Sequence, residues 1–332
     1  MAESLSLVLN AVLIFAAGVS LVMWVRTLPA IRRQGVRGFA DTWLPVKRRE
    51  CPFWGVAEIF VMFGSMQVFG QLLLLFAQQK GWYKLPEPGE SLAAQTPEML
   101  FVVLAISALA NCVSIGLVLL WMWNKEWFGS VRKFGLSISP SMLRLGVKAA
   151  VMLLPPVLAV AALVNLLLAE YEHEVLNVLQ QLGSPRVFAV LFFGTAIVAP
   201  IAEEILFRGL IQGGLQRLAG RVVGDDESHE KELASKSQSA NVGFIAEDAN
   251  KDGQETRGNV PQGNWEPVSY WPVFVASVIF ACMHLGQGAA PIPLFLLSVG
   301  LGYLYRQTGS LIPCIVVHMM LNGMTLLAAM LQ

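Results

Sequence analysis

Long runs of apolar residues, separated by short polar stretches, recur along most of this 332-residue chain. A helix needs about 20 predominantly apolar residues to cross a hydrocarbon core roughly 30 Å thick. Windows of that length predict eight membrane-spanning helices, of which the sixth and seventh are short enough to suggest tilted or broken helices. The predicted spans lie at approximately 5–25, 53–77, 99–123, 146–168, 187–210 or a little beyond, 271–285, 291–305 and 310–331. The pattern predicts an all-α membrane protein, a bundle of about eight transmembrane helices.

Charged residues between the spans predict the orientation of the chain. The connection between the first two spans is strongly basic, and basic connections favour the cytoplasmic side. Its cations are Arg26, Arg32, Arg33, Arg37, Lys47, Arg48 and Arg49. The third connection is basic and the fourth is acidic with Glu170, Glu172 and Glu174, as alternation requires. We therefore expect a multi-pass protein whose N-terminus lies outside and whose first span is a retained anchor rather than a signal peptide.

One segment of the chain has the composition of a soluble linker. Residues 224–267 are rich in Asp, Glu, Ser, Asn, Gln and Gly, and their few apolar residues show no sustained period. Such a segment buries too little apolar surface to fold alone. We interpret residues at about 222–269 as a flexible cytoplasmic insertion, with a docking segment as the alternative and His229 as a solvated histidine. It interrupts a catalytic region at 187–331, which follows N-terminal transmembrane helices and loops at 1–186.

Composition restricts the class of partner. With 55% hydrophobic and only 14% charged residues, the chain is too apolar for an ordinary soluble domain. Its net charge is zero, which gives no reason to expect nucleic acid as a partner. The apolar composition indicates that membrane lipid surrounds the chain. The four cysteines, Cys51, Cys112, Cys282 and Cys314, show no paired spacing, which predicts free thiols rather than a disulfide framework.

The fifth span contains three ionisable residues, Glu203, Glu204 and Arg208. Charged groups inside a membrane are costly and mark functional sites by default. Glu204 and Arg208 are four residues apart, so they share a helix face and can pair. Glu203 lies about 100° around the helix, without a local cation. We predict that Glu203 is a catalytic base and that Glu204 is the orienting partner of Arg208; the alternative is a purely architectural network.

Two later spans add imidazole and amide groups. His284 follows Phe280 by four residues, and Asn322 follows His318 by four, so each pair projects from one helix face. Their depths permit these side chains to meet Glu203 in the cytoplasmic half of the bilayer. A lone histidine on an apolar helix is more often a satisfied core residue, but two histidines with a glutamate pair favour a site.

These groups can activate water and hold an oxyanion, which favours an intramembrane hydrolase. Two other classes of function stay open. One is a non-catalytic membrane scaffold or an immunity-type binding protein, and the other is a proton-coupled transporter. A transporter predicts inverted repeats, whereas the polar residues here are confined to the C-terminal half of the chain.

The three clusters also resemble motifs of a known family. EEILFR at 203–208 matches EExxxR, FACMH at 280–284 matches FxxxH, and HMMLN at 318–322 matches HxxxN. These are, in order, the motifs of the CPBP or Abi family of intramembrane glutamate proteases, which includes type II CAAX prenyl endopeptidases. The resemblance covers residues from about 187 to 331.

The resemblance implies eight transmembrane helices around a polar cavity that opens to the cytosol and the membrane. It implies that Glu203 and His284 activate water, that His318 and Asn322 hold the oxyanion, and that the substrate is a membrane-associated peptide or protein, possibly lipidated. The insertion departs from the short connection usual in the family. No cofactor is firmly implied. Two histidines and a glutamate could bind zinc, but without an HExxH helix we favour a metal-free mechanism.

Overall fold

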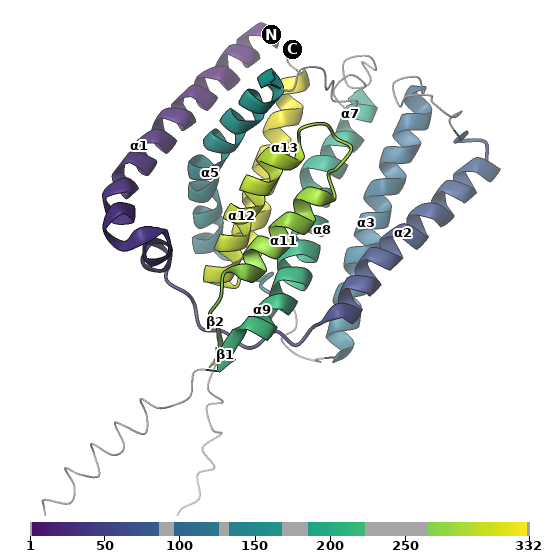
Figure 1. The fold of residues 1–332 in the computed structure, drawn as a ribbon. Helices are drawn as coiled ribbons and strands as arrows, with labels where there is room; N and C mark the ends of the chain where they lie inside the picture. Colours follow the sequence, from purple (N-terminus) through teal and green to yellow (C-terminus); the bar gives the residue numbers. More distant parts are fainter. Residues whose placement is uncertain (1, 86–95, 126–132, 168–184, 223–264, 331–332) are drawn as a thin grey trace, which may run out of the picture.

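The computed structural model describes residues 2–85, 96–125, 133–167, 185–222 and 265–330 (Figure 1). Within these residues the chain forms eight helical rods and one small hairpin, which confirms the predicted all-α fold. The rods are α1 (Ala2–Trp43), α2 (Val56–Gln79), α3 (Pro97–Lys125), α5 (Pro140–Leu167), a continuous rod at 185–219, α11 (Trp271–Cys282), α12 (Pro291–Thr308) and α13 (Ile312–Met330). All eight lie where the apolar windows placed a span.

Six of the rods in the described part of the chain are long and apolar enough to cross a membrane. The other two are α11 and α12, the short sixth and seventh predicted spans. Helix α11 has only 12 residues. Both pack against each other and against the longer rods rather than standing alone in lipid. The protein is therefore an integral multi-pass membrane protein in which a pair of shorter helices completes the bundle.

Helix α1 is longer than its apolar run. The segment after residue 25, predicted as a connection, continues as helix to Trp43. The helix passes Pro29 and bends at Gly35, whose φ of 71° is accessible because glycine has no Cβ. Most cations of the expected first connection therefore lie on a kinked helix rather than in a loop. Charged residues indicate that a segment contacts water, but a segment in water can still be helical.

A proline attaches α1 to α5. Pro156 has no N–H and cannot bond to the carbonyl of Met152, four residues earlier. Two side chains of α1 donate to that carbonyl oxygen instead, Ser20 Oγ at 3.0 Å and Trp24 Nε1 at 3.1 Å. The two helices run side by side in Figure 1. A buried carbonyl without a partner is costly, so these bonds fix the position of α1.

The 185–219 rod changes its helical register twice. Its parts are α7 (Pro185–Phe192), the π-helix η2 (Phe193–Val198), α8 (Ala199–Glu204), the π-helix η3 (Ile205–Gln212) and α9 (Gly213–Ala219). At the end of η3 the N–H of Gly213 bonds to the Arg208 carbonyl, five residues back. This leaves the Gly209 carbonyl oxygen to accept a hydrogen bond of 2.8 Å from Trp54 Nε1. Such π-helical turns frequently occur at functional sites.

A short antiparallel hairpin follows the rod and defines what we call the hairpin end of the bundle. It consists of β1 (Gly220–Val222) and β2 (Trp265–Pro267), with Val222 opposite Trp265. The Trp265 side chain is buried, and its backbone exchanges two hydrogen bonds with Arg49. Residues 265–267, which fall within the expected insertion, therefore form a strand whose Trp265 packs in the bundle. Residues 223–264, including His229, lie outside the described residues.

Candidate active site

An ion pair joins two turns of the 185–219 rod. Arg208 Nε lies 3.2 Å from Glu204 Oε2, and both side chains are buried. The contact predicted from their spacing of four residues is confirmed. The guanidinium also donates from Nη2 to Ser298 Oγ of α12 at 2.9 Å, and it lies over the Phe280 ring at 4.7 Å. Arg208 thus joins three helices.

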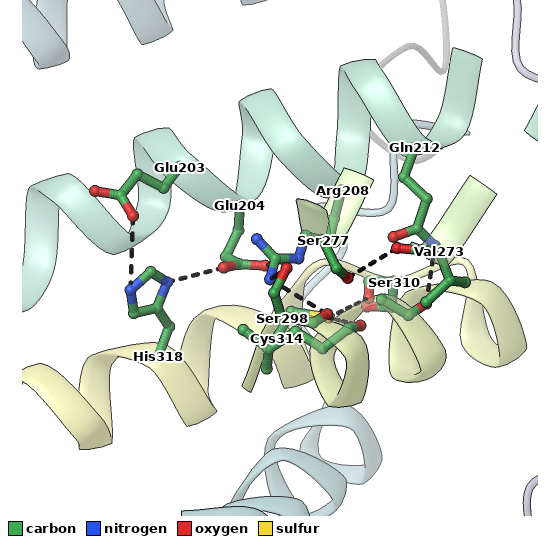
Figure 2. Close-up of polar contacts among 12 residues, drawn as sticks. Glu203, Glu204, Arg208, Gln212, Val273, Ser277, Ser298, Ser310, Cys314 and His318 are labelled. Carbon is green, nitrogen blue, oxygen red and sulfur yellow. Dashed lines mark hydrogen bonds and ion pairs between the residues drawn. The ribbon is translucent and has the colours of Figure 1, made fainter. Parts of the chain in front are cut away.

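The imidazole of His318 lies between the two glutamates (Figure 2). His318 Nδ1 is 2.8 Å from Glu204 Oε1, and His318 Nε2 is 3.7 Å from Glu203 Oε2. Because an ionised carboxylate only accepts hydrogen bonds, Nδ1 carries a proton and donates it to Glu204. Glu203 lacks a partner cation on its own helix, as predicted, but α13 supplies this imidazole opposite it.

The two glutamates differ in their access to the surroundings. The Glu204 side chain is 0% exposed, whereas that of Glu203 is 30% exposed. Glu204 is held by Arg208 and His318, so its carboxylate has both a cation and a hydrogen-bond donor. Glu203 is the carboxylate that a substrate or a water molecule can reach.

Phe280 lies at the centre of the cluster. Its ring is fully buried and contacts the rings of both His284 and His318, with centroids 4.8 and 5.9 Å away. The edge of Phe207 packs against the same ring, with centroids 5.0 Å apart. This phenyl ring therefore sets the positions of the two imidazoles and of Arg208 together.

His284 lies beyond the end of α11, not inside a span that continues to 285 as predicted. The helix ends at Cys282, and the chain passes through turns in which Gly286 has a φ of 95°. His284 Nδ1 lies 2.8 Å from the Phe280 carbonyl oxygen. A carbonyl can only accept, so Nδ1 donates, and a neutral ring would then have its lone pair on Nε2. Among the described contacts, His284 is bonded to neither Glu203 nor Glu204.

Asn322 contacts the backbone of the 185–219 rod. Its Nδ2 donates to the Thr195 carbonyl oxygen at 2.9 Å. In the register of η2 that carbonyl would bond to the N–H five residues later, but Pro200 has none. The side chain of Asn322 thus replaces a missing backbone donor. One of its two N–H groups is used in this bond, and the other can still donate.

Three residues of this region were missed by the sequence analysis. Ser298 bonds to Arg208 but has no neighbouring motif that would have indicated it. Gln212 lies four residues after Arg208 and is fully buried, so its spacing was a usable signal. Phe280 was named in the FxxxH motif and as the residue one turn before His284 but was given no role, although it packs against the rings of Phe207, His284 and His318.

The described residues contain no group of three or more His, Cys, Asp or Glu side chains arranged to hold a metal ion. The set that a zinc site would need is Glu203, His284 and His318. The cation Arg208 next to Glu204 and His318 reduces the local negative charge that would attract a divalent ion. The zinc alternative stays a prediction. The metal-free mechanism and the zinc mechanism would use the same residues.

Comparison with known families agrees with the motifs. Residues 185–225 and 256–324 match the family model described as type II CAAX prenyl endopeptidase Rce1-like. No curated protein and no solved structure matches the chain. The matched residues include both glutamates, Arg208, both histidines and Asn322, and they span the 185–219 rod, α11, α12 and most of α13. The C-terminal region that builds this site is therefore similar to the Rce1-like type II CAAX prenyl endopeptidases.

Proposed function

We propose that this protein is an intramembrane endopeptidase that cleaves a membrane-associated peptide or protein with water activated at Glu203. One observation carries the proposal. A buried carboxylate with its own cation, Glu204 with Arg208, holds an imidazole 3.7 Å from a second carboxylate that is partly exposed. If the network were only structural, the buried ion pair of Glu204 and Arg208 would be sufficient. The partly exposed Glu203 is therefore the carboxylate that we expect to react.

The proposed reaction begins at Glu203. Its carboxylate takes a proton from a water molecule while the water oxygen attacks the scissile carbonyl carbon. The carbonyl oxygen becomes an oxyanion, and Glu203 becomes neutral. When the intermediate collapses, the C–N bond breaks and Glu203 returns the proton to the leaving amine. General acid–base catalysis of this kind contributes about 100- to 10,000-fold to the rate.

His318 supports the negative charge in this scheme. As an imidazolium it is stabilised by Glu204, which accepts from Nδ1. In the resting state its Nε2 faces the charged Glu203. Once Glu203 is protonated, the Nε2 proton is free to donate to the oxyanion. Pre-oriented donors of this kind act strongly because water is excluded around them.

His284 and Asn322 have subsidiary roles in the proposal. The neutral His284 ring offers Nε2 as an acceptor, which suits orientation of the attacking water. Asn322 offers its second N–H to the oxyanion while the first holds the Thr195 carbonyl. Asn322 thereby couples the oxyanion donor to the backbone that carries Glu203.

The proposal is tested with Glu203→Gln in purified protein reconstituted in lipid. We expect loss of peptide cleavage, measured by mass spectrometry, with a nearly unchanged melting temperature, because glutamine keeps the shape of a partly exposed side chain. Glu204→Gln is the matched comparison, and it should lower both activity and stability because it breaks a buried ion pair. Retained cleavage by Glu203→Gln would exclude Glu203 as the base.

The same cleavage assay tests which substrate the protein cleaves and whether cleavage requires a metal ion. A peptide with a prenylated C-terminal cysteine motif and an unprenylated leader-like peptide are compared as substrates. Cleavage of only the first assigns a lipidated substrate, and cleavage of the second alone excludes it. Cleavage that survives exhaustive chelation supports the metal-free mechanism, whereas loss restored by Zn²⁺ supports the zinc alternative. Normal folding without cleavage of any peptide supports the scaffold or binding-protein alternative.

A further inference from the structure

A line of buried polar side chains leaves the site along the 185–219 rod. Glu204 is followed at intervals of four residues by Arg208, Gln212 and Gln216, and all four side chains are at most 1% exposed. Polar side chains inside a membrane protein are costly and are retained where they line a pathway or a site. The proposed reaction uses only Glu204 and Arg208, so the two glutamines need another explanation. We call these four residues the polar column.

The π-helix keeps the column on one face of the rod. In an α-helix four residues advance about 40° beyond a full turn, so three such steps would turn the side chains about 120° away. The wider turn of η3, at Ile205–Gln212, removes this drift. The partners confirm the alignment, because they advance along α12 and then reach the hairpin end. They are Ser298 Oγ for Arg208 Nη2 (2.9 Å), Gly302 O for Gln212 Nε2 (2.8 Å) and Arg49 Nη2 for Gln216 Oε1 (2.8 Å).

Each member of the column keeps a polar atom without a hydrogen-bond partner among the described residues. The atoms are Glu204 Oε2, Arg208 Nη1, Gln212 Oε1 and Gln216 Nε2. Glu204 Oε2 is compensated in part by its ion pair with Arg208. The other three form an alternating series of donor, acceptor and donor. A buried polar group without a partner costs about 1–3 kcal/mol, so three in one line are unusual.

The amide orientations that create this series are fixed by their partners. Gln212 must direct its NH₂ group to the Gly302 carbonyl, because its own oxygen would repel another oxygen. Gln216 must direct its oxygen to Arg49, because a guanidinium only donates. The unpartnered acceptor of Gln212 and donor of Gln216 therefore follow from the geometry. Water both donates and accepts, so it can bond to donor and acceptor in turn along the series.

A glycine of α12 makes room beside the column. A Cβ added to Gly302 would lie 2.8 Å from Gln212 Oε1 and 2.7 Å from Val273 Cγ1. Any larger residue there would displace the acceptor in the middle of the series. At the hairpin end the column meets Arg49, which is held by the Tyr305 carbonyl oxygen at 3.0 Å.

We propose that the polar column binds a file of water molecules that connects the hairpin end of the bundle with Glu204 and the site beside it. The role of this file in catalysis rests on the proposed function, because a hydrolase consumes one water molecule for each bond it cleaves. Sixteen residues separate Glu204 from Gly220, which corresponds to roughly 20 Å of helix. The column therefore runs from the hairpin end to the buried side of the site, behind the partly exposed Glu203.

The charge of Arg49 at the hairpin end determines what the file carries, because the charge of Arg208 is compensated by its ion pair with Glu204. A fixed guanidinium in a narrow path repels protons and other cations while neutral water passes. The column therefore supplies water and does not conduct protons. In the proposed reaction the proton removed from water goes to Glu203 and then to the leaving amine, so no proton has to travel along the column.

The test measures hydration directly in the full-length protein in lipid nanodiscs. Radiolytic hydroxyl-radical labelling in ¹⁸O water modifies buried side chains only where water is bound nearby. The reporters are Cys314, which bonds to the Leu301 carbonyl next to Gly302, and Tyr305, whose carbonyl holds Arg49; both are at most 2% exposed. Met122 of α3 is equally buried and is the internal control. We expect Cys314 and Tyr305 to be labelled while Met122 is not.

Two substitutions locate the water. Gln212→Leu and Gln216→Leu keep the side-chain volume but remove the polar atoms, and we expect most of the label on Cys314 and Tyr305 to disappear. Gln212→Asn keeps an amide donor and an amide acceptor on the same face of the rod and should keep the label. If the folded parent protein labels Cys314 and Tyr305 no more than Met122, the proposal is overturned without recourse to any variant.

Cleavage assays separate this inference from the proposed function. We expect Gln212→Leu to lower the turnover number with little change in the Michaelis constant. If the column is labelled in a protein that cleaves no peptide, the proposed function is wrong but the water file is supported. If cleavage depends on Glu203 but the column is not labelled, the proposed function is supported and the water file is wrong. Loss of the label with unchanged turnover would overturn the supply role of the file.

Discussion

Two pairs of helices in this protein have similar hydropathy and opposite surroundings. In the most apolar windows of α1 and α2, 6% of the residues are buried in the bundle, whereas the share is 44% for the 185–219 rod and 50% for α13. Lipid tails are as apolar as leucine, so hydropathy alone gives apolar helices no reason to pack together. Polar contacts between helices, such as those that Arg208, His318 and Asn322 make in the second pair, help decide which helices form the interior.

Polar residues differ in the same way between the two regions. Glu58 is also fully buried, but it lies in the first turn of α2, where it accepts from the Gly55 N–H at 2.8 Å, from Trp121 Nε1 at 3.2 Å and from the Lys125 ammonium. Its carboxylate is satisfied as a helix cap. Glu203 lies in the middle of its rod with one long contact to His318. Completeness of the bonding distinguishes the structural carboxylates Glu58 and Glu204 from Glu203, the carboxylate that we propose to be reactive.

The largest effect is expected from Arg208→Ala in the packed region. The substitution leaves the buried carboxylate of Glu204 without its cation, and we predict a loss of about 3–5 kcal/mol in the free energy of unfolding. Thermal or denaturant unfolding in detergent measures it. The matched control is Arg221→Ala, which removes an exposed pair with Glu266 and should cost at most about 1 kcal/mol. Equal losses would mean that Glu204 does not depend on Arg208.

The next effect concerns Asn322 and is expected in catalysis. Loss of one oxyanion donor lowers turnover by about 100- to 1000-fold, so we predict that reduction for Asn322→Ala, with little change in the Michaelis constant. Asn322→Asp should be at least as harmful, because its negative charge would face both the oxyanion and the Thr195 carbonyl oxygen. If Asn322→Asp has near-normal turnover, Asn322 is not an oxyanion donor, and its role is the structural bond to the Thr195 carbonyl.

Local sequence patterns predicted those features of the fold and site that depend on neighbours in the chain. Apolar windows placed all eight rods, and the four-residue spacing predicted the contact between Glu204 and Arg208. The bridge from His318 to both glutamates was not predictable, because it joins positions 114 residues apart whose meeting depends on how α13 packs against the rod. Depth along the helices permitted that contact but did not specify it.

Errors of boundary also have physical causes. The basic segment after residue 25 was interpreted as a connection, yet it is helical to Trp43, because arginines are good helix formers that were read only as charges. Trp265 was included in the insertion because its neighbours are polar. Its burial comes from long-range contacts with Arg49 and Gly220, which no local period reveals.

A glycine pair tests the difference in packing between the two regions. A Cβ added to Gly146 of α5 would lie 2.7 Å from Val316 Cβ and 3.2 Å from Pro313 Cα, both in α13. We predict that Gly146→Ala lowers the free energy of unfolding by about 1–3 kcal/mol through overpacking. In α2 the equivalent atom on Gly64 meets nothing within 4 Å. Gly64→Ala should be neutral or slightly stabilising, and a loss equal to that of Gly146→Ala would refute the contrast.

The smallest effect is expected where the insertion is removed at its structural boundaries. Val222 and Trp265 are paired across the hairpin, so a short Gly-containing turn can join them without moving either strand. We predict that replacing residues 223–264 by such a turn leaves the melting temperature and peptide cleavage nearly unchanged, because loop length affects closure entropy only weakly. Extending the deletion to residue 267 removes the buried indole of Trp265 and its stacking on Arg49, whose guanidinium lies 5.5 Å from the ring. That longer deletion should cost about 3–5 kcal/mol, the range for losing a buried aromatic side chain. If both deletions unfold equally, the hairpin does not hold the end of the rod; if both are tolerated, Trp265 contributes nothing to the bundle.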